Sequence, residues 1–143
     1  MEDLSLHILD IAENSIRAHA ENVKIKLAES ENNDLLVLEI EDDGMGMDDE
    51  TLKNATDPFY TTKQGKKFGL GLALLSQACE ETGGNMRIEK AGAKGTRIIA
   101  TFYKKNIDMK PIGNIAETIR VLKISYPNIF FSFEHVIENG GSM

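Results

Sequence analysis

The sequence contains no tryptophan, one cysteine and three prolines among its 143 residues. Because Cys79 is alone, the chain can form neither an internal disulfide nor a zinc site built from several cysteines, and a single thiol suits a reducing compartment. No apolar run approaches the roughly 18 residues that a membrane-spanning helix requires. Residues 1–5 also lack the basic start and the apolar stretch of a signal peptide. We therefore expect a cytoplasmic protein without a membrane span.

Positive charge is scarce as well. The chain carries 16 Lys and Arg against 23 Asp and Glu, a formal net charge of −7. The deficit lies in residues 1–103, which hold 11 basic and 19 acidic side chains, whereas residues 104–143 hold 5 and 4. A protein that binds the phosphate backbone of nucleic acid presents a basic surface, so we expect no nucleic-acid partner. Any phosphate must then be held locally, by a metal ion, a few lysines or backbone N–H groups.

The length suits one well-buried domain, and local patterns predict its order of elements. Helical spacing of apolar residues indicates helices, and period-two alternation bounded by turn residues indicates strands. These patterns predict helices at 4–20, 48–55 and 69–83, and strands at 23–27, 35–40, 86–90 and 96–103. Two hairpins separated by helices favour an α/β (α+β) sandwich of two layers, with a mixed, mostly antiparallel sheet and helices on one face.

The last part of the chain is set apart by the polar residues 104–106 and by Pro111. We expect a main domain over residues 1–103 and an extension over residues 104–143 that packs on or beside it. In the extension, residues 115–124 have a helical pattern and residues 129–133 a strand pattern, whose phenylalanines are expected to cover the sheet.

Asp10 and Asn14 form the first candidate site. Four residues apart on a helix, their side chains project from the same side. The Asn14 carboxamide could hold a hydrated Mg²⁺ while Asp10 positions a water molecule. The alternative is a solvated helix face, because this spacing is common on exposed helices. The pair alone does not decide between them.

The segment Asp42-x-Gly44-x-Gly46 directly follows a predicted buried strand. A carboxylate there can accept a hydrogen bond from the exocyclic amine of a purine, and glycines let a ring lie against bare backbone. Met45 and Met47 would then pack around the base. A calcium loop is a rival, but the EF-hand spacing is absent, and a plain turn remains the simpler alternative.

The third candidate is Gly69-x-Gly71 at a predicted helix start. Free N–H groups and the helix dipole make such a start suitable for an anion. The preceding loop adds hydroxyls and lysines at residues 61–67. The spacing matches neither the phosphate loop nor the dinucleotide motif, and glycines also serve close helix packing.

These elements occur in a fixed order, and with Gly95-Thr96 they resemble the GHKL ATPases, which share the Bergerat nucleotide-binding fold. That family includes gyrase B, Hsp-type chaperones, histidine kinases and mismatch-repair MutL proteins. Residues 10–18 resemble its N box, 42–46 its adenine-binding box and 69–72 its glycine box. Residues 57–63 are similar to the short lid of sensor histidine kinases. The resemblance covers residues 4–103.

The resemblance implies a role for each matching residue. Asn14 would be the Mg²⁺ ligand, Asp42 would bind the adenine amine, and Thr96 would support it. Asp10 would be the catalytic residue, where hydrolysing members have Glu and many kinases Asn. The remaining contacts to ATP would come from Gly44, Gly46, Met47, Thr61, Thr62, Lys63, Lys66, Lys67, Gly69, Leu70, Gly71 and Leu72.

The same resemblance implies a Mg²⁺-dependent ATP-binding protein, a protein kinase or anti-sigma-type kinase that acts on a separate protein. The phosphoacceptor is expected on that partner, because His7 shares the helix of Asp10 while His19 and His135 lie outside every motif. One alternative is a non-catalytic ATP-dependent switch whose lid, residues 57–69, presents a surface to a partner. Another is an interaction domain with an inactive nucleotide site. A homodimer stays open.

Overall fold

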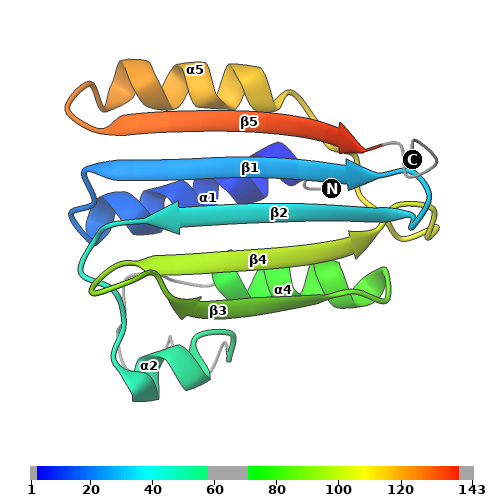
Figure 1. Cartoon of the computed structure of the whole chain (residues 1–143), viewed down its shortest axis with the longest axis horizontal. Coiled ribbons are helices and arrows are strands. Elements are labelled where there is room, and N and C mark those ends of the chain that lie inside the picture. The colour runs from blue at the N-terminus through cyan, green and yellow to red at the C-terminus, as the bar shows by residue number, and fades with distance from the viewer. Residues whose placement is uncertain (1–2, 58–70, 139–143) are drawn as a thin grey trace.

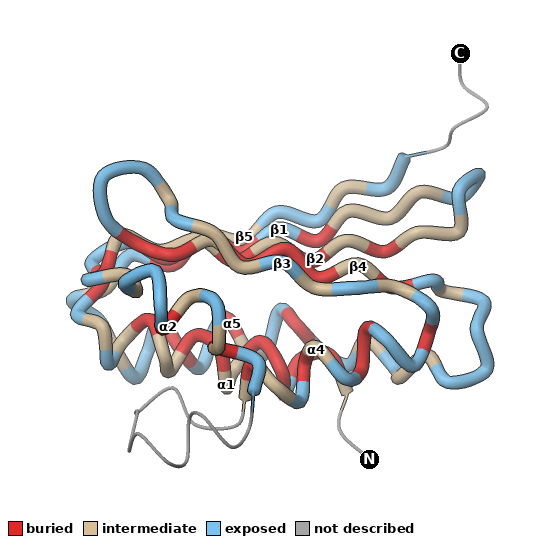
Figure 2. Tube along the Cα trace, turned by 90° about the horizontal axis from the view of Figure 1, so that it is seen from below, coloured by how far each residue is buried: buried red, intermediate tan, exposed pale blue. Residues whose placement is uncertain are grey.

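The computed structural model describes residues 3–57 and 71–138. Figure 1 shows its helices and strands, and Figure 2 shows the helices as one layer on a single side of the sheet. The elements are α1 (Leu4–Arg17), β1 (Asn22–Ser30), β2 (Leu35–Asp42), α2 (Asp49–Asn54), α4 (Gly71–Glu81), β3 (Asn85–Lys90), β4 (Thr96–Tyr103), α5 (Ile115–Ser125) and β5 (Phe130–Glu138). The predicted sandwich of two layers is confirmed.

The sheet has the strand order β3-β4-β2-β1-β5. Both predicted hairpins form, since β1 pairs antiparallel with β2 and β3 with β4. The central pairing of β2 with β4 is also antiparallel, and its register sets Asp42 opposite Thr96. Two candidate residues that are far apart in the sequence therefore become neighbours at one end of the sheet.

The core lies between the sheet and the helix layer. Alternate strand residues face the helices because successive side chains of a strand point to opposite faces. Full burial of such a side chain contributes about 1.5–3 kcal/mol. The most deeply buried side chains include Ile8, Ile11, Ile25, Leu27, Leu36, Leu38, Ile40, Leu72, Leu75 and Phe102.

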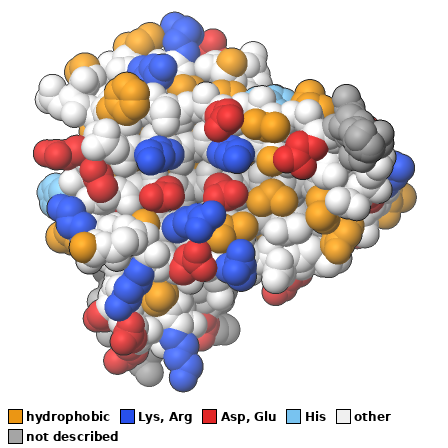
Figure 3. Space-filling view, viewed as in Figure 1, with side chains coloured by type: hydrophobic (Ala, Val, Ile, Leu, Met, Phe, Trp, Pro, Cys, Tyr) orange, Lys and Arg blue, Asp and Glu red, His pale blue; other side chains and the backbone are white. Residues whose placement is uncertain are grey.

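The other face of the sheet is open and charged (Figure 3). Basic and acidic side chains are interspersed across its strands, and Arg97 pairs with Glu39 at 2.7 Å and with Glu89 at 3.3 Å. Among residues 3–57 and 71–138, no helix combines the length and the apolarity needed to cross a bilayer.

The C-terminal segment adds to both layers. β5 pairs with β1 in parallel, unlike the antiparallel hairpins. Phe131 and Leu122 are buried in the same core as the other strands and helices. Backbone carbonyls of Pro111 and Ile112 accept hydrogen bonds from Leu4 N at 2.9 Å and Ser5 N at 3.0 Å, at the start of α1. The division at residue 103 stays a prediction.

Two expectations about these elements need correction. Phe130 does not cover the sheet, since its side chain is 66% exposed while Phe131 is buried. α1 ends at Arg17 and not at Ala20, because His19 adopts a left-handed backbone conformation with φ +62°. The start of α2 follows expectation, with the Asp48 carboxylate accepting from Thr51 N at 2.7 Å.

Candidate functional site

A cavity of about 650 Å³ opens between α1, the end of β2, α2 and β4. Its size falls in the range of small-molecule sites in proteins. The residues that line it include apolar side chains and a few polar groups from these elements, from the loop between β2 and α2, and from α4. They are Ile11, Asn14, Ser15, Arg17, Ala18, Asp42, Met45, Gly46, Met47, Asp48, Thr51, Leu72, Thr96 and Ile98.

The Asp42 carboxylate lines this cavity and is held by two donors. Ser15 Oγ donates to its Oδ2 at 2.5 Å, and Gly44 N donates to its Oδ1 at 3.0 Å. A carboxylate offers about four acceptor positions, so both oxygens can accept a further hydrogen bond. Asp42 can therefore receive a donor from a ligand in the cavity.

Asp43, the next residue, has a different task. Its carboxylate accepts from Glu21 N at 2.8 Å, Asn22 N at 2.9 Å and Asn22 Nδ2 at 2.9 Å. The hydrogen bond from the Asn22 side chain, together with those from the backbone, lowers the pKa of Asp43 to about 2. Asp43 fixes the turn before β1 and is not among the residues that line the cavity.

The glycines of this segment allow close backbone packing. A Cβ on Gly44 would lie 2.8 Å from both Cβ and O of Ala18. Gly46 has φ +79° and faces the Gly95 backbone, where a Cβ would approach O at 3.0 Å. A Cβ on Gly95, with φ +104°, would overlap the Asp42 carbonyl oxygen. The glycines bring Asp42, the loop after β2 and the start of β4 together, and their contact with a ligand stays a prediction.

Asn14 lines the cavity with an incomplete set of partners. Its Oδ1 accepts from Arg17 Nη1 at 3.0 Å, and its buried Nδ2 has no hydrogen-bond partner among the described residues. A buried amide hydrogen without a partner costs free energy, so the side chain suits a polar ligand. No group of three or more His, Cys, Asp and Glu that could hold a metal occurs in residues 3–57 and 71–138. Any Mg²⁺ would thus need oxygens of its ligand in addition to Asn14.

Asp10 lies one helical turn before Asn14 and does not line the cavity itself. The start of α4 packs beside it, since a Cβ on Gly71 would lie 3.4 Å from the Asp10 Cβ. This places the predicted catalytic residue beside the start of the helix that follows the predicted lid.

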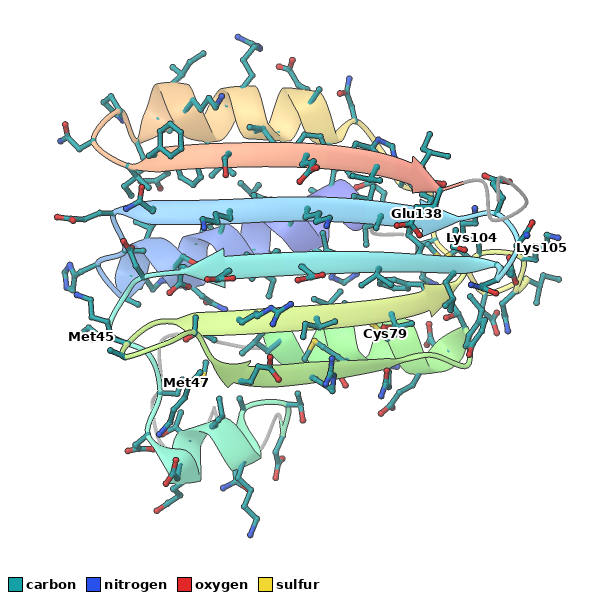
Figure 4. All side chains as sticks on the ribbon, in the orientation of Figure 1. Met45, Met47, Cys79, Lys104, Lys105 and Glu138 are labelled. Atoms are coloured by element: carbon teal, nitrogen blue, oxygen red, sulfur yellow. The ribbon has the colours of Figure 1, made fainter. Side chains whose placement is uncertain are left out.

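The structure brings part of the predicted set together. Asn14, Asp42, Gly46, Met47, Leu72 and Thr96 line one cavity, whereas Asp10, Gly44 and Gly71 are not among its lining residues. Met45 and Met47 extend from the end of β2, at the opposite end of the sheet from Lys104, Lys105 and Glu138 (Figure 4). Met45 lines the rim and is 68% exposed. Thr61, Thr62, Lys63, Lys66, Lys67, Gly69 and Leu70 lie outside the described residues.

Sequence reasoning missed four polar residues of the cavity, which are Ser15, Arg17, Asp48 and Thr51. Arg17 belongs to the polar stripe of α1 that also carries Asp10 and Asn14, so its spacing was a usable signal. Ser15 lies on the buried face, and its partner Asp42 is 27 residues away in the sequence. No local pattern reveals such a contact.

The fold and the cavity define a two-layer α/β sandwich with a ligand-sized site between α1 and the sheet. The chain belongs to the histidine kinase-, DNA gyrase B-, and HSP90-like ATPase family, whose sequence model matches residues 2–106. Among curated proteins, it is 32% identical over 88 residues to sporulation kinase C of Bacillus subtilis. This alignment covers 62% of this chain and 20% of that protein. The chain spans 7% to 23% of the length of the curated sensor proteins and kinases that it matches.

Solved structures agree with this assignment. The catalytic domain of histidine kinase ThkA, in a nucleotide-free form, superposes with a TM-score of 0.54 and 26% identity over 69% of this chain and 65% of that one. The MutL ATPase domain of Aquifex aeolicus, complexed with ADP, superposes with a TM-score of 0.57 and 14% identity over 100% and 63%. At that low identity the MutL likeness shows the fold alone.

Proposed function

We propose that the protein binds ATP with Mg²⁺ in the cavity beside α1 and acts as a kinase on a separate protein. The observation that carries the proposal is the Asp42 carboxylate, held by Ser15 and by the backbone of Gly44 inside a cavity of about 650 Å³. Membership of an ATPase family and likeness to histidine kinases support it.

The base would lie in the part of the cavity next to the sheet. Asp42 would accept a hydrogen bond from the 6-amino group of adenine, and Thr96 lies opposite it in the register of β2 and β4. The side chains of Met47, Leu72 and Ile98 offer apolar contacts to the ring. Guanine presents a carbonyl oxygen in place of the amine, so the same carboxylate would repel it.

The phosphates would lie toward Asn14 and Arg17. Mg²⁺, when bound, neutralises phosphate charge and favours phosphoryl transfer. The Asn14 Oδ1 is the protein atom suited to ligate it, and it would exchange its hydrogen bond from the Arg17 guanidinium for the metal. Asp10 would orient a water or hydroxyl group. Its side chain is one methylene shorter than glutamate, which favours weak hydrolysis.

The acceptor would belong to another molecule. His7 is buried on α1, and His135 on β5 pairs with Glu29 at 2.6 Å. None of the three histidines is among the residues that line the cavity. This arrangement supports a partner that carries the phosphoacceptor.

The runner-up function is an ATP-dependent switch without catalysis. The observation that favours it is Asp10 itself, whose shorter carboxylate suits a protein that holds ATP without hydrolysing it. The predicted lid, residues 57–69, would then present its surface to a partner.

Transfer of labelled phosphate separates the two functions. The protein is incubated with γ-labelled ATP and Mg²⁺, alone and with candidate partner proteins. A kinase labels a partner and not itself, and this label disappears in Asp42→Asn. A switch binds ATP tightly and labels nothing.

A further inference from the structure

Ser15 presents a buried hydroxyl whose effect on recognition of the base the proposed function does not specify. The residue is 2% exposed, and its Oγ donates to Asp42 Oδ2 at 2.5 Å. Alanine would fill much of the same space, favours helices more strongly and buries no polar group. A buried serine at this position is therefore better explained by its effect on Asp42 than by the packing of α1.

The effect concerns the direction of the carboxylate. The terminal torsion of an aspartate has a broad energy profile, so one hydrogen bond leaves the plane of the carboxylate loosely defined. Gly44, in the loop after β2, donates its N–H to Asp42 Oδ1 at 3.0 Å. Ser15, on α1, donates its hydroxyl to Asp42 Oδ2. Two donors on separate elements fix the plane and leave the remaining lone pairs for the cavity.

We propose that Ser15 is a positioning residue for base recognition, which aims the Asp42 carboxylate at the exocyclic amine of the bound base. The proposal rests on the proposed function, because it explains how Asp42 would be oriented to recognise adenine. Ser15 acts through Asp42. Its contribution should therefore depend on whether the base carries the amine.

The chain offers a matched control on the same helix. Ser5 is 7% exposed, and its Oγ donates to Asp3 Oδ1 at 2.6 Å. It makes the same type of bond to a carboxylate near the start of α1 and is not among the cavity residues. Replacing Ser5 reports the general cost of losing a buried serine on α1.

The experiment compares ATP with purine riboside 5′-triphosphate, which differs only in lacking the 6-amino group. Dissociation constants are measured by calorimetry for the wild type, Ser15→Ala and Ser5→Ala. We expect the wild type to prefer ATP by on the order of 10-fold or more. Ser15→Ala should lose most of that preference through weaker ATP binding, with the affinity for purine riboside triphosphate unchanged. Ser5→Ala should keep the wild-type preference.

A second pair of variants protects the test against a folding defect. Ser15→Thr and Ser15→Val have nearly the same shape, and only the threonine keeps the hydroxyl. We expect Ser15→Thr to retain the preference for ATP and Ser15→Val to lose it.

Two results would overturn the proposal: equal weakening of both ligands by Ser15→Ala, or an undiminished preference in Ser15→Val. If the wild type binds neither triphosphate, the proposed function itself fails. A wild type that binds both ligands equally would refute the reading of the base by Asp42.

Discussion

At the scale of single residues, the adjacent carboxylates Asp42 and Asp43 have different roles. Asp42 faces the cavity with both oxygens able to accept more bonds, while Asp43 is engaged by three donors from residues 21 and 22. The two side chains diverge because successive side chains of an extended chain alternate in direction. A substitution of Asp42 should therefore weaken ligand binding, and a substitution of Asp43 should lower the stability of the fold.

Asn14→Ala should remove the dependence of ATP binding on Mg²⁺. A carboxamide oxygen completes the octahedral shell that Mg²⁺ demands, so its loss should weaken binding in Mg²⁺ by about 10-fold or more. Binding in EDTA should change far less. Paired titrations in Mg²⁺ and in EDTA measure both, with Glu13→Ala as the control from the neighbouring position. Equal losses in the two buffers would show that Asn14 does not bind the metal.

Asp10→Glu should raise the intrinsic rate of ATP hydrolysis, and Asp10→Asn should lower it by roughly 100-fold with little change in affinity. The longer glutamate reaches a water that aspartate orients poorly, and asparagine cannot accept its proton. Phosphate release under single-turnover conditions is the measurement. Unchanged hydrolysis in Asp10→Asn would exclude Asp10 as the base.

At the scale of elements, the turn between α1 and β1 depends on the charge of Asp43. Its pKa falls from 3.8 to about 2 on folding. A lowered pKa stabilises the fold above the unfolded value, and this contribution disappears as the pH falls from about 4 to about 2. Asp43→Asn should therefore lower the free energy of unfolding at pH 7 and matter little near pH 2.

Urea denaturation of the two proteins at several pH values measures this difference. Asp49→Asn is the control, because that carboxylate on α2 is 91% exposed. A destabilisation by Asp43→Asn that stays constant from pH 7 to pH 2 would contradict the assigned pKa.

The elements also show what the sequence can predict. Alternation located the strands of both hairpins because burial of one face has a period of two. It could not predict that β5 pairs parallel to β1, since that choice depends on contacts across more than 100 residues. The end of α1 was misplaced because nothing in the local sequence reveals the left-handed conformation of His19. Asp42 and Thr96, both singled out from the sequence, line one cavity, but their pairing comes from the register of β2 and β4.

At the scale of the whole molecule, Cys79 reports on global opening. The thiol is buried on α4 beneath the sheet (Figure 4), and burial raises its pKa to about 12. A neutral, inaccessible thiol reacts only when the core opens. We expect slow modification by a thiol reagent in the native protein and fast modification in urea.

Nucleotide should slow this reaction further, because a ligand that binds only the folded state stabilises it. At a concentration 100 times the dissociation constant, the gain is about 2.7 kcal/mol, or roughly 100-fold in the rate through global opening. Modification at the same rate with and without saturating ATP would mean that Cys79 is reached by a local path or that ATP does not bind.

The central claim is that Asp42 reads adenine in the cavity beside α1. Competition between ATP and GTP for the wild type and for Asp42→Asn tests it most directly. We predict that the wild type prefers ATP by 10-fold or more and that Asp42→Asn, while still folded, loses both the affinity and the preference. Equal affinity of the wild type for the two nucleotides would contradict the account.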